Sequence, residues 1–226
     1  MRREYNFWVC DGLLTHRGVG QITDSLIHMS LGSTLWNSLV YTNDLIVHNN
    51  FVEPFAGSGK TPDLAYTPMI NKIKSQFPTI VLESGRSESQ PQFMKNAELW
   101  LKGSTGAVKV VFLFKFFPVN ICNEIKAKLY VCCLSAGELA ITKYACSSLL
   151  YYYLSYILLI DPLTLQKIFP CSISPVTDPC IKVEELFDGR PPDDMEGETK
   201  HPLSLERLRL VACAVILQQG HLPILC

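Results

Sequence analysis

The clearest pattern of apolar and polar positions lies between residues 60 and 117. Residues 79–83 are apolar and β-branched and end on a carboxylate, which predicts a strand. Residues 91–103 repeat apolar positions on one helical face, and residues 107–117 form a nearly unbroken apolar run typical of a strand covered on both faces. Residues 63–66 lie between two prolines and predict an edge strand. The order strand, strand, helix, strand predicts an α/β sandwich.

The segments on either side are less regular. Residues 22–40 carry apolar positions at helical spacing and predict one interrupted helix or two short ones. Residues 45–47 and 51–55 are short apolar runs that predict strands. Near the C-terminus, Ser204 is a suitable N-cap for a last helix that ends at Gly220.

A change of composition after Pro118 suggests a division of the chain. We expect a core domain over residues 1–118, an apolar stretch over 119–167, and an acidic linker with a C-terminal helix over 168–226. Residues 129–166 contain only three charged side chains. Either a divergent insertion or a retained intron translated in the gene model would produce such a stretch.

Several features indicate the compartment. The apolar run over residues 149–160 is shorter than the roughly 20 residues of a membrane span, so a buried segment is favoured over a transmembrane helix. Residues 1–8 have no apolar run behind them and predict no signal peptide. The nine cysteines contain no C-x-x-C pair, which favours free thiols over a zinc site. We therefore expect a cytoplasmic or nuclear protein without a membrane partner.

Charge is distributed unevenly along the chain. The formal net charge is −1, but residues 60–117 carry eight basic and four acidic side chains, whereas residues 177–200 carry three basic and eight acidic ones. The central region could therefore face the phosphate backbone of a nucleic acid, and the acidic stretch could not.

A glycine-rich segment at residues 56–61 is similar to the end of a phosphate-binding P-loop. Pro54 occupies the position where that loop needs its first glycine, and Pro62 follows at once. Nucleotide binding would require an unbroken helix after Lys60, so we favour a plain loop.

Two carboxylates carry the stronger signal. Asp63 begins one predicted strand and Glu83 closes the next, so both can meet at the open end of the sheet. Such a pair can hold Mg²⁺ or Mn²⁺, which activates water and polarises a phosphodiester. A turn aspartate and a solvated glutamate at a strand end are the ordinary alternative.

Asp63 after Pro62 and Glu83 on its strand resemble the PD-(D/E)XK nuclease superfamily. More closely, several segments resemble a large family of uncharacterised fungal proteins with this core. They are residues 60–66, 78–89, 96–101 and 106–113, with shorter matches at 168–170 and 185–187. The resemblance implies a restriction-endonuclease-like fold, in which helices flank a mixed central sheet, with an irregular C-terminal extension. It also implies that Asp63 and Glu83 bind the metal ion.

One departure from that motif concerns its lysine. Gly85 stands two positions after Glu83, where the superfamily has the lysine that stabilises transition-state charge. Lys95 is the candidate substitute on the predicted helix, although an ideal wheel turns it away from the buried face; Arg86 is a weaker one. The sequence thus predicts either a divergent nuclease using Asp63, Glu83 and Lys95, or an interaction protein that keeps the fold without the chemistry.

Overall fold

The computed structural model describes residues 38–42, 47–70, 73–85, 88–135, 138–141, 166–169, 178–193 and 195–223. The strands of the main sheet are β1 (Leu39–Thr42), β2 (Leu64–Ile70), β3 (Ile73–Lys74), β4 (Ile80–Gly85), β5 (Val110–Phe116), β7 (Ala127–Ser135), β8 (Glu138–Ile141) and β9 (Gln166–Phe169). The remaining elements are α3 (Gln90–Gly103), β6 (Glu124–Ile125), β10 (Cys180–Lys182), α5 (Val183–Leu186), β11 (Lys200–Pro202), α6 (Leu205–Gln218) and β12 (Leu222–Pro223).

The main sheet is mixed and mostly antiparallel. Its path is β1-β2-β4-β5-β7-β8, with β3 beside β2 and β9 beside β7. Only β4 and β5 run parallel among its described strands, joined by the crossover through α3. The predicted α/β class is confirmed at this level.

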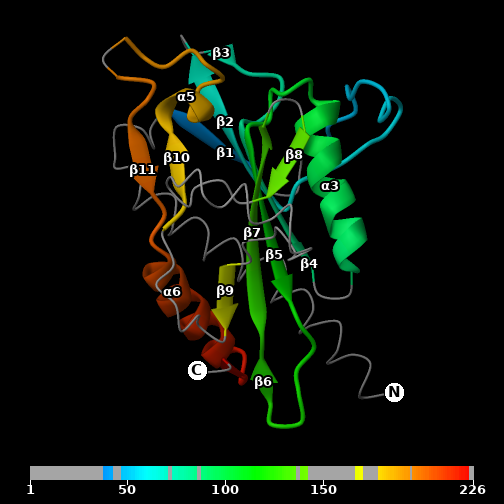
Figure 1. The fold of residues 1–226 in the computed structure, drawn as a ribbon, viewed down its shortest axis with the longest axis vertical. Coiled ribbons are helices and arrows are strands. Elements are labelled where there is room, and N and C mark those ends of the chain that lie inside the picture. The colour runs from blue at the N-terminus through cyan, green and yellow to red at the C-terminus, as the bar shows by residue number, and fades with distance from the viewer. Residues whose placement is uncertain are drawn as a thin grey trace, which may run out of the picture.

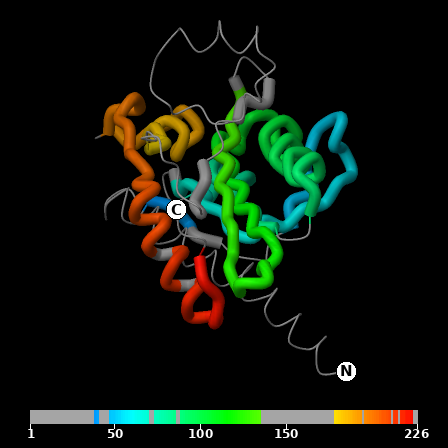
Figure 2. The backbone as a smooth tube through the Cα atoms, turned by 60° about the horizontal axis from the view of Figure 1, so that its bottom comes forward, coloured from blue at the N-terminus to red at the C-terminus, as the bar shows by residue number. Residues whose placement is uncertain are grey.

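Each face of the sheet is covered by a different part of the chain. Figures 1 and 2 show α3 and α6 on opposite sides of β5 and β7. The side chains of α3 pack on Val81 of β4 and on Val111 and Leu113 of β5, whereas the C-terminal segment packs on Leu82 and Phe112 of the same two strands. Successive residues of β4 and β5 alternate between these two cores, as a strand buried on both faces requires.

The predicted strand at 79–83, helix at 91–103, strand at 107–117 and last helix after Ser204 are confirmed. Ser89 caps α3 by accepting a hydrogen bond from the backbone N–H of Gln92, and Ser204 caps α6 by accepting one from Arg207. Local signals for these elements agree with their tertiary environment, since the apolar face of each helix meets a sheet face.

Other predictions were wrong. The strand predicted at 63–66 is β2, which is not an edge, because β1 and β4 flank it. Proline has no backbone N–H to donate to a neighbouring strand. Pro68 is tolerated in β2 because β2 pairs with β4 only from Leu64 to Tyr66, so no β2–β4 hydrogen bond is needed at Pro68.

The predicted strand at 51–55 is a turn, and the predicted helix end at residues 39–40 belongs to β1. The rest of the predicted helix at 22–40 lies outside the described residues.

The sheet continues beyond the predicted boundary at residue 118. β7 pairs with β5 from Ala127 to Cys132, so these residues belong to the same two cores as the segment before them. Residues 142–165, including the apolar run at 149–160, lie outside the described part, so neither origin of that stretch is decided. The predicted acidic linker at 177–200 contains β10, α5 and the first residue of β11. Among the described residues, no helix is long and apolar enough to cross a membrane.

Candidate functional site

Glu83 is a buried carboxylate on the face of the sheet that α3 covers. Its side chain lies on the same side of β4 as Val81, and the residue is 4% exposed. One carboxylate oxygen accepts a hydrogen bond from Nε1 of Trp100 at 2.7 Å, and the other lies 3.1 Å from Nζ of Lys60. A buried charge needs partners of this kind, and Glu83 has one neutral donor and one cation.

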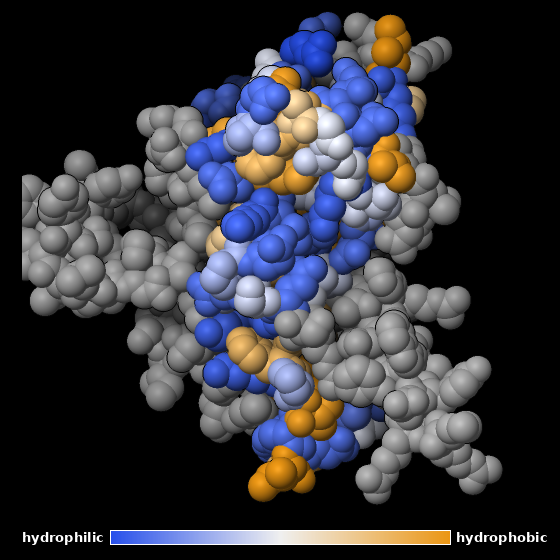
Figure 3. Space-filling model, turned by 90° about the vertical axis from the view of Figure 1, so that its right-hand side faces the viewer, coloured by the Kyte–Doolittle hydropathy of each residue, from blue (hydrophilic) through white to orange (hydrophobic). Residues whose placement is uncertain are grey.

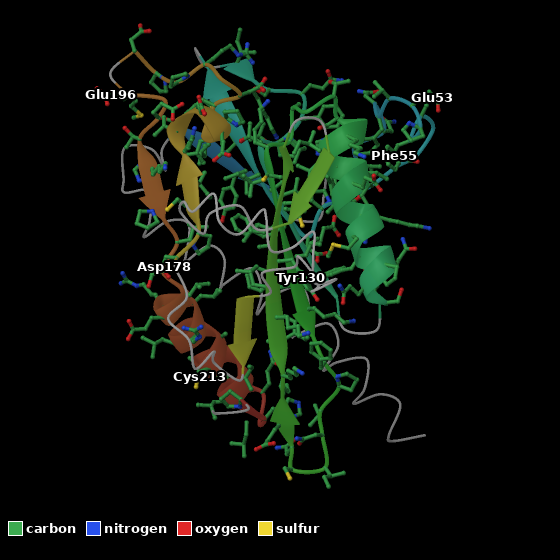
Figure 4. All side chains as sticks on the ribbon, viewed as in Figure 1. Glu53, Phe55, Tyr130, Asp178, Glu196 and Cys213 are labelled. Atoms are coloured by element: carbon green, nitrogen blue, oxygen red, sulfur yellow. The ribbon has the colours of Figure 1, made fainter. Side chains whose placement is uncertain are left out.

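Lys60 reaches Glu83 from the loop that precedes β2. Lys60 and His48 exchange backbone hydrogen bonds of 2.9 Å, which closes the loop between them. Figure 4 shows this loop, with Glu53 and Phe55, beside the C-terminal end of α3. Gly103 permits the contact, because a Cβ there would lie 3.0 Å from Phe51. The loop that ends at Lys60 is therefore packed against the C-terminal end of α3.

Aromatic rings fix the indole that donates to Glu83. Phe51 and His48 both meet Trp100 edge to face, with centroids 5.4 and 5.5 Å away, and His48 also stacks on Phe77. Burial lowers the pKa of His48, and the charge of Lys74 lowers it further. The neutral imidazole is thus favoured, and His48 acts as an aromatic ring that packs against Trp100 and Phe77.

Asp63 lies immediately before β2, at the open end of the sheet. Continuing the antiparallel β2–β4 register by one residue places Asp63 opposite Glu83. Its Oδ2 accepts hydrogen bonds of 2.6 Å from both the backbone N–H and the hydroxyl of Ser84. The Asp63 charge also acts on Glu83, where it raises the pKa. The two predicted carboxylates are therefore close enough to interact.

The electrostatics of Glu83 are governed by burial. Desolvation is the largest effect, and together with the Asp63 charge it raises the pKa of Glu83 to about 7 against the opposing pull of Lys60 and Trp100. Near neutral pH the group therefore exchanges readily between its neutral and its charged form. A proton or a cation that arrives at this carboxylate relieves the repulsion from Asp63.

The position where the motif has its lysine is tightly packed against α3. A Cβ at Gly85 would lie 3.0 Å from the ring of Phe93 and 3.5 Å from Oε2 of Glu88, so a side chain here requires the Phe93 ring to move by a few tenths of an ångström. Lys95, the substitute proposed from the sequence, is exposed on α3. The cation beside Glu83 is instead Lys60. Arg86 lies outside the described residues.

Lys60 and Trp100 are the site residues that sequence reasoning missed. Lys60 was assigned to the segment that is similar to a P-loop. Its position three residues before Asp63 was a signal that it could lie near the carboxylates. Trp100 was assigned to the core face of the helix, and its indole N–H was not considered. The chain enters β2 shortly after Lys60 rather than a helix, so the structural context of a P-loop is absent here.

The residues present fit a hydrated divalent ion better than a fully protein-coordinated one. Within the described ranges, no group of three His, Cys, Asp or Glu side chains is placed to hold a metal. Mg²⁺, however, is commonly bound through one or two carboxylates together with waters and substrate phosphates. Asp63 and Glu83 supply two such groups from neighbouring strands.

Comparisons with protein-family models, curated proteins and solved structures find no match to this chain.

The indole N–H of Trp100 gives a first testable prediction. Replacing Trp100 with phenylalanine keeps an aromatic ring but leaves one oxygen of Glu83 without its donor. We expect the free energy of unfolding to fall by about 2 kcal/mol, the scale of a hydrogen bond to a charged group. The loss should be larger at pH 8 than at pH 5, because the donor matters most when Glu83 is ionised. Urea denaturation at both pH values measures it; an equal loss would indicate an effect of packing alone.

Proposed function

We propose that this chain is a nuclease-like protein that acts on nucleic acid with one divalent metal ion held by Asp63 and Glu83. The observation that carries the proposal is the buried Glu83 carboxylate, which lies beside Lys60 and within the field of Asp63. The pairing of antiparallel β2 with a parallel β4–α3–β5 unit, with both acids at one end, supports a restriction-endonuclease-like core.

Each residue has a distinct role in this proposal. Ser84 orients Asp63 through two hydrogen bonds, and Trp100 orients Glu83. When bound, Mg²⁺ or Mn²⁺ would supply charge neutralisation at the phosphate and an activated water. Lys60 replaces Lys95 in the proposed set, because its ammonium is already at the carboxylate and can neutralise charge that develops beside it.

The alternative is an interaction protein that keeps this fold without catalysis. It is favoured by the completeness of the hydrogen bonding: both oxygens of Glu83 and Oδ2 of Asp63 have donors within the protein. In that case the carboxylates and Lys60 form a polar network that connects β2, β4 and the loop. The role of this network is to favour one arrangement of these segments over others.

Calorimetry with Mn²⁺ or Mg²⁺ tests the metal site directly. We expect one binding site in the wild type and its loss in Asp63→Asn and in Glu83→Gln, while the surface variant Glu98→Gln binds as the wild type does. Because the pKa of Glu83 is about 7, metal binding at pH 7 should release a fraction of a proton. Titrations in two buffers with different ionisation enthalpies measure that release. A wild type that binds neither ion would leave the interaction-protein alternative.

A further inference from the structure

A polar cavity lies at the end of the main sheet away from the two carboxylates. Its volume is about 320 Å³, at the lower end of the range for small-molecule sites. Four segments line it: the loop at Asn50, the β3–β4 connection at 75–79, the turn after α3 at 104–107 and the turn after α5 at 188–190. Figure 1 shows α5 and the C-terminal end of α3 at the same, upper end of the sheet. Thr79 precedes Glu83 by four residues of extended chain, so these two are on the order of 13 Å apart along the strand.

The backbone of two lining residues is held in an unusual conformation. Thr105 and Asp188 have φ of 57° and 54°, in the left-handed region that favours glycine. Among the described residues other than glycine, only Asn123 shares this feature. Residues in such conformations concentrate at ligand sites, where the side chain that they present offsets the conformational cost. Here they bring a hydroxyl and a carboxylate to one cavity.

The cavity also presents polar side chains whose hydrogen-bonding groups are unused. Within the described part of the chain, the side chains of Asn50, Ser75 and Gln76 make no hydrogen bond, and all three line the cavity. Each amide offers two N–H donors and an acceptor oxygen, and the hydroxyl can both donate and accept. The cavity therefore suits a ligand with several groups that donate and accept in turn.

Arg190 adds a cation with spare donors. The turn that carries it is fixed, because Oδ1 of Asp188 lies 2.7 Å from Nζ of Lys109 and the Thr79 hydroxyl donates to the carbonyl of Leu186 at 2.8 Å. Arg190 itself lies 3.5 Å from Oδ2 of Asp188, and its side chain is 63% exposed. Asp188 is the one side-chain partner that Arg190 has among the described residues. Most of its N–H donors are thus available, and a guanidinium matches the oxygens of a phosphate.

Several other classes of ligand are disfavoured. A nucleobase needs an open ring on which to stack, but Phe77 is 9% exposed and already stacks on His48. A polyanion would meet the carboxylate of Asp188, and a cation would meet a carboxylate that already has two basic partners. An apolar ligand would remove water from the amides and hydroxyls without replacing its hydrogen bonds. In Figure 3, hydrophilic residues surround a small hydrophobic patch at this upper end of the α3 side, which agrees with a hydroxylated ligand.

We propose that this cavity binds a sugar that carries one phosphate group. The phosphate lies at Arg190, and the sugar hydroxyls, which both donate and accept, pair with Asn50, Ser75 and Gln76. Such a ligand is either a free sugar phosphate or the ribose phosphate of a mononucleotide. The inference goes beyond the proposed nuclease-like function, because it needs neither the metal ion nor the carboxylates of that site.

Isothermal calorimetry with ribose 5-phosphate and glucose 6-phosphate, in EDTA, tests the cavity. Arg190→Gln should weaken binding at least about tenfold, the scale of a lost hydrogen bond to a charged group. Asn50→Ala and Gln76→Ala should each weaken it about fivefold, the scale of a neutral hydrogen bond. Both should leave the Tm unchanged, because neither side chain makes a hydrogen bond within the described protein. Adenosine 5′-monophosphate distinguishes the sources: binding equal to that of ribose 5-phosphate indicates a free sugar phosphate, and tighter binding indicates a mononucleotide.

Arg207→Gln and Gln92→Ala are the controls, since they remove the same kinds of group from exposed positions on α6 and α3. Both should bind as the wild type does. Asp63→Asn should also bind normally, so a failed metal site and a failed sugar-phosphate site are distinguishable. Equal losses in the controls would overturn the proposal, as would a wild type that binds neither sugar phosphate. Inorganic phosphate that competes as strongly as ribose 5-phosphate would overturn the assignment to a sugar.

Discussion

Glu83→Gln and Asp63→Asn are each expected to abolish cleavage of nucleic acid, and Lys60→Gln to slow it by a factor on the order of 10²–10³. The first two remove the charged ligands of the proposed metal ion, and the third removes the ammonium that lies 3.1 Å from Glu83. The measurement is the rate of cleavage of labelled single-stranded and duplex DNA and RNA, with Mg²⁺ or Mn²⁺ and then with EDTA. Cleavage should require the divalent ion, since the metal supplies the activated water.

Comparing lysines makes the test specific to the site. Lys95→Gln decides between the lysine suggested by the sequence and the one beside the carboxylate. Because Lys95 is exposed on α3, we expect its replacement to change the rate little, as for Lys74→Gln. Loss of cleavage in Lys95→Gln with normal cleavage in Lys60→Gln would contradict the proposed role of Lys60. A wild type that cleaves none of these substrates would remove the catalytic proposal and favour the interaction protein.

Stability should fall as pH rises through the range in which the buried glutamate loses its proton. The pKa of Glu83 is raised from its ordinary 4.5 to about 7, so between these values the folded state keeps a proton that the unfolded chain has released. Since the folded state then binds more protons, the free energy of unfolding decreases with pH in that window. The contribution of Glu83 is most favourable below pH 4.5, and above about pH 7 the full cost of the buried charge is present.

Glu83→Gln isolates this contribution. The raised pKa corresponds to about 3 kcal/mol between the two ends of the window. Relative to Glu83→Gln, the wild type should therefore lose on the order of 3 kcal/mol of stability between pH 4.5 and pH 8, measured by urea denaturation in EDTA. Glu98→Gln, on the surface of α3, is the control and should run parallel to the wild type. Parallel profiles for wild type and Glu83→Gln would mean that Lys60 and Trp100 fully offset the burial.

The local sequence was sufficient for the central elements. β4, α3, β5 and α6 were predicted because period, caps and apolar composition agree within each segment, and tertiary packing then uses the same faces. The edge assignment of β2 failed because a proline restricts only the pairing at its own position. The extent of the sheet past residue 118 was missed because a change of composition was interpreted as a boundary.

The candidate site divides in the same way. Asp63 and Glu83 were identified from the sequence because each stands at the end of a predicted strand, which is a local property. Their partners were not, because Lys60 and Trp100 reach Glu83 only after a loop folds over the end of α3.

The sequence by itself determined the order of the central strands and helix, and it placed the two candidate carboxylates on neighbouring strands. Only the tertiary structure decided that Lys60 lies at Glu83, that Gly85 packs tightly against Phe93, and that three lysines meet at Phe117. The physical reason is that strand and helix signals depend on neighbours within a few residues. Burial, charge and register depend instead on segments that are distant in the sequence and adjacent in space.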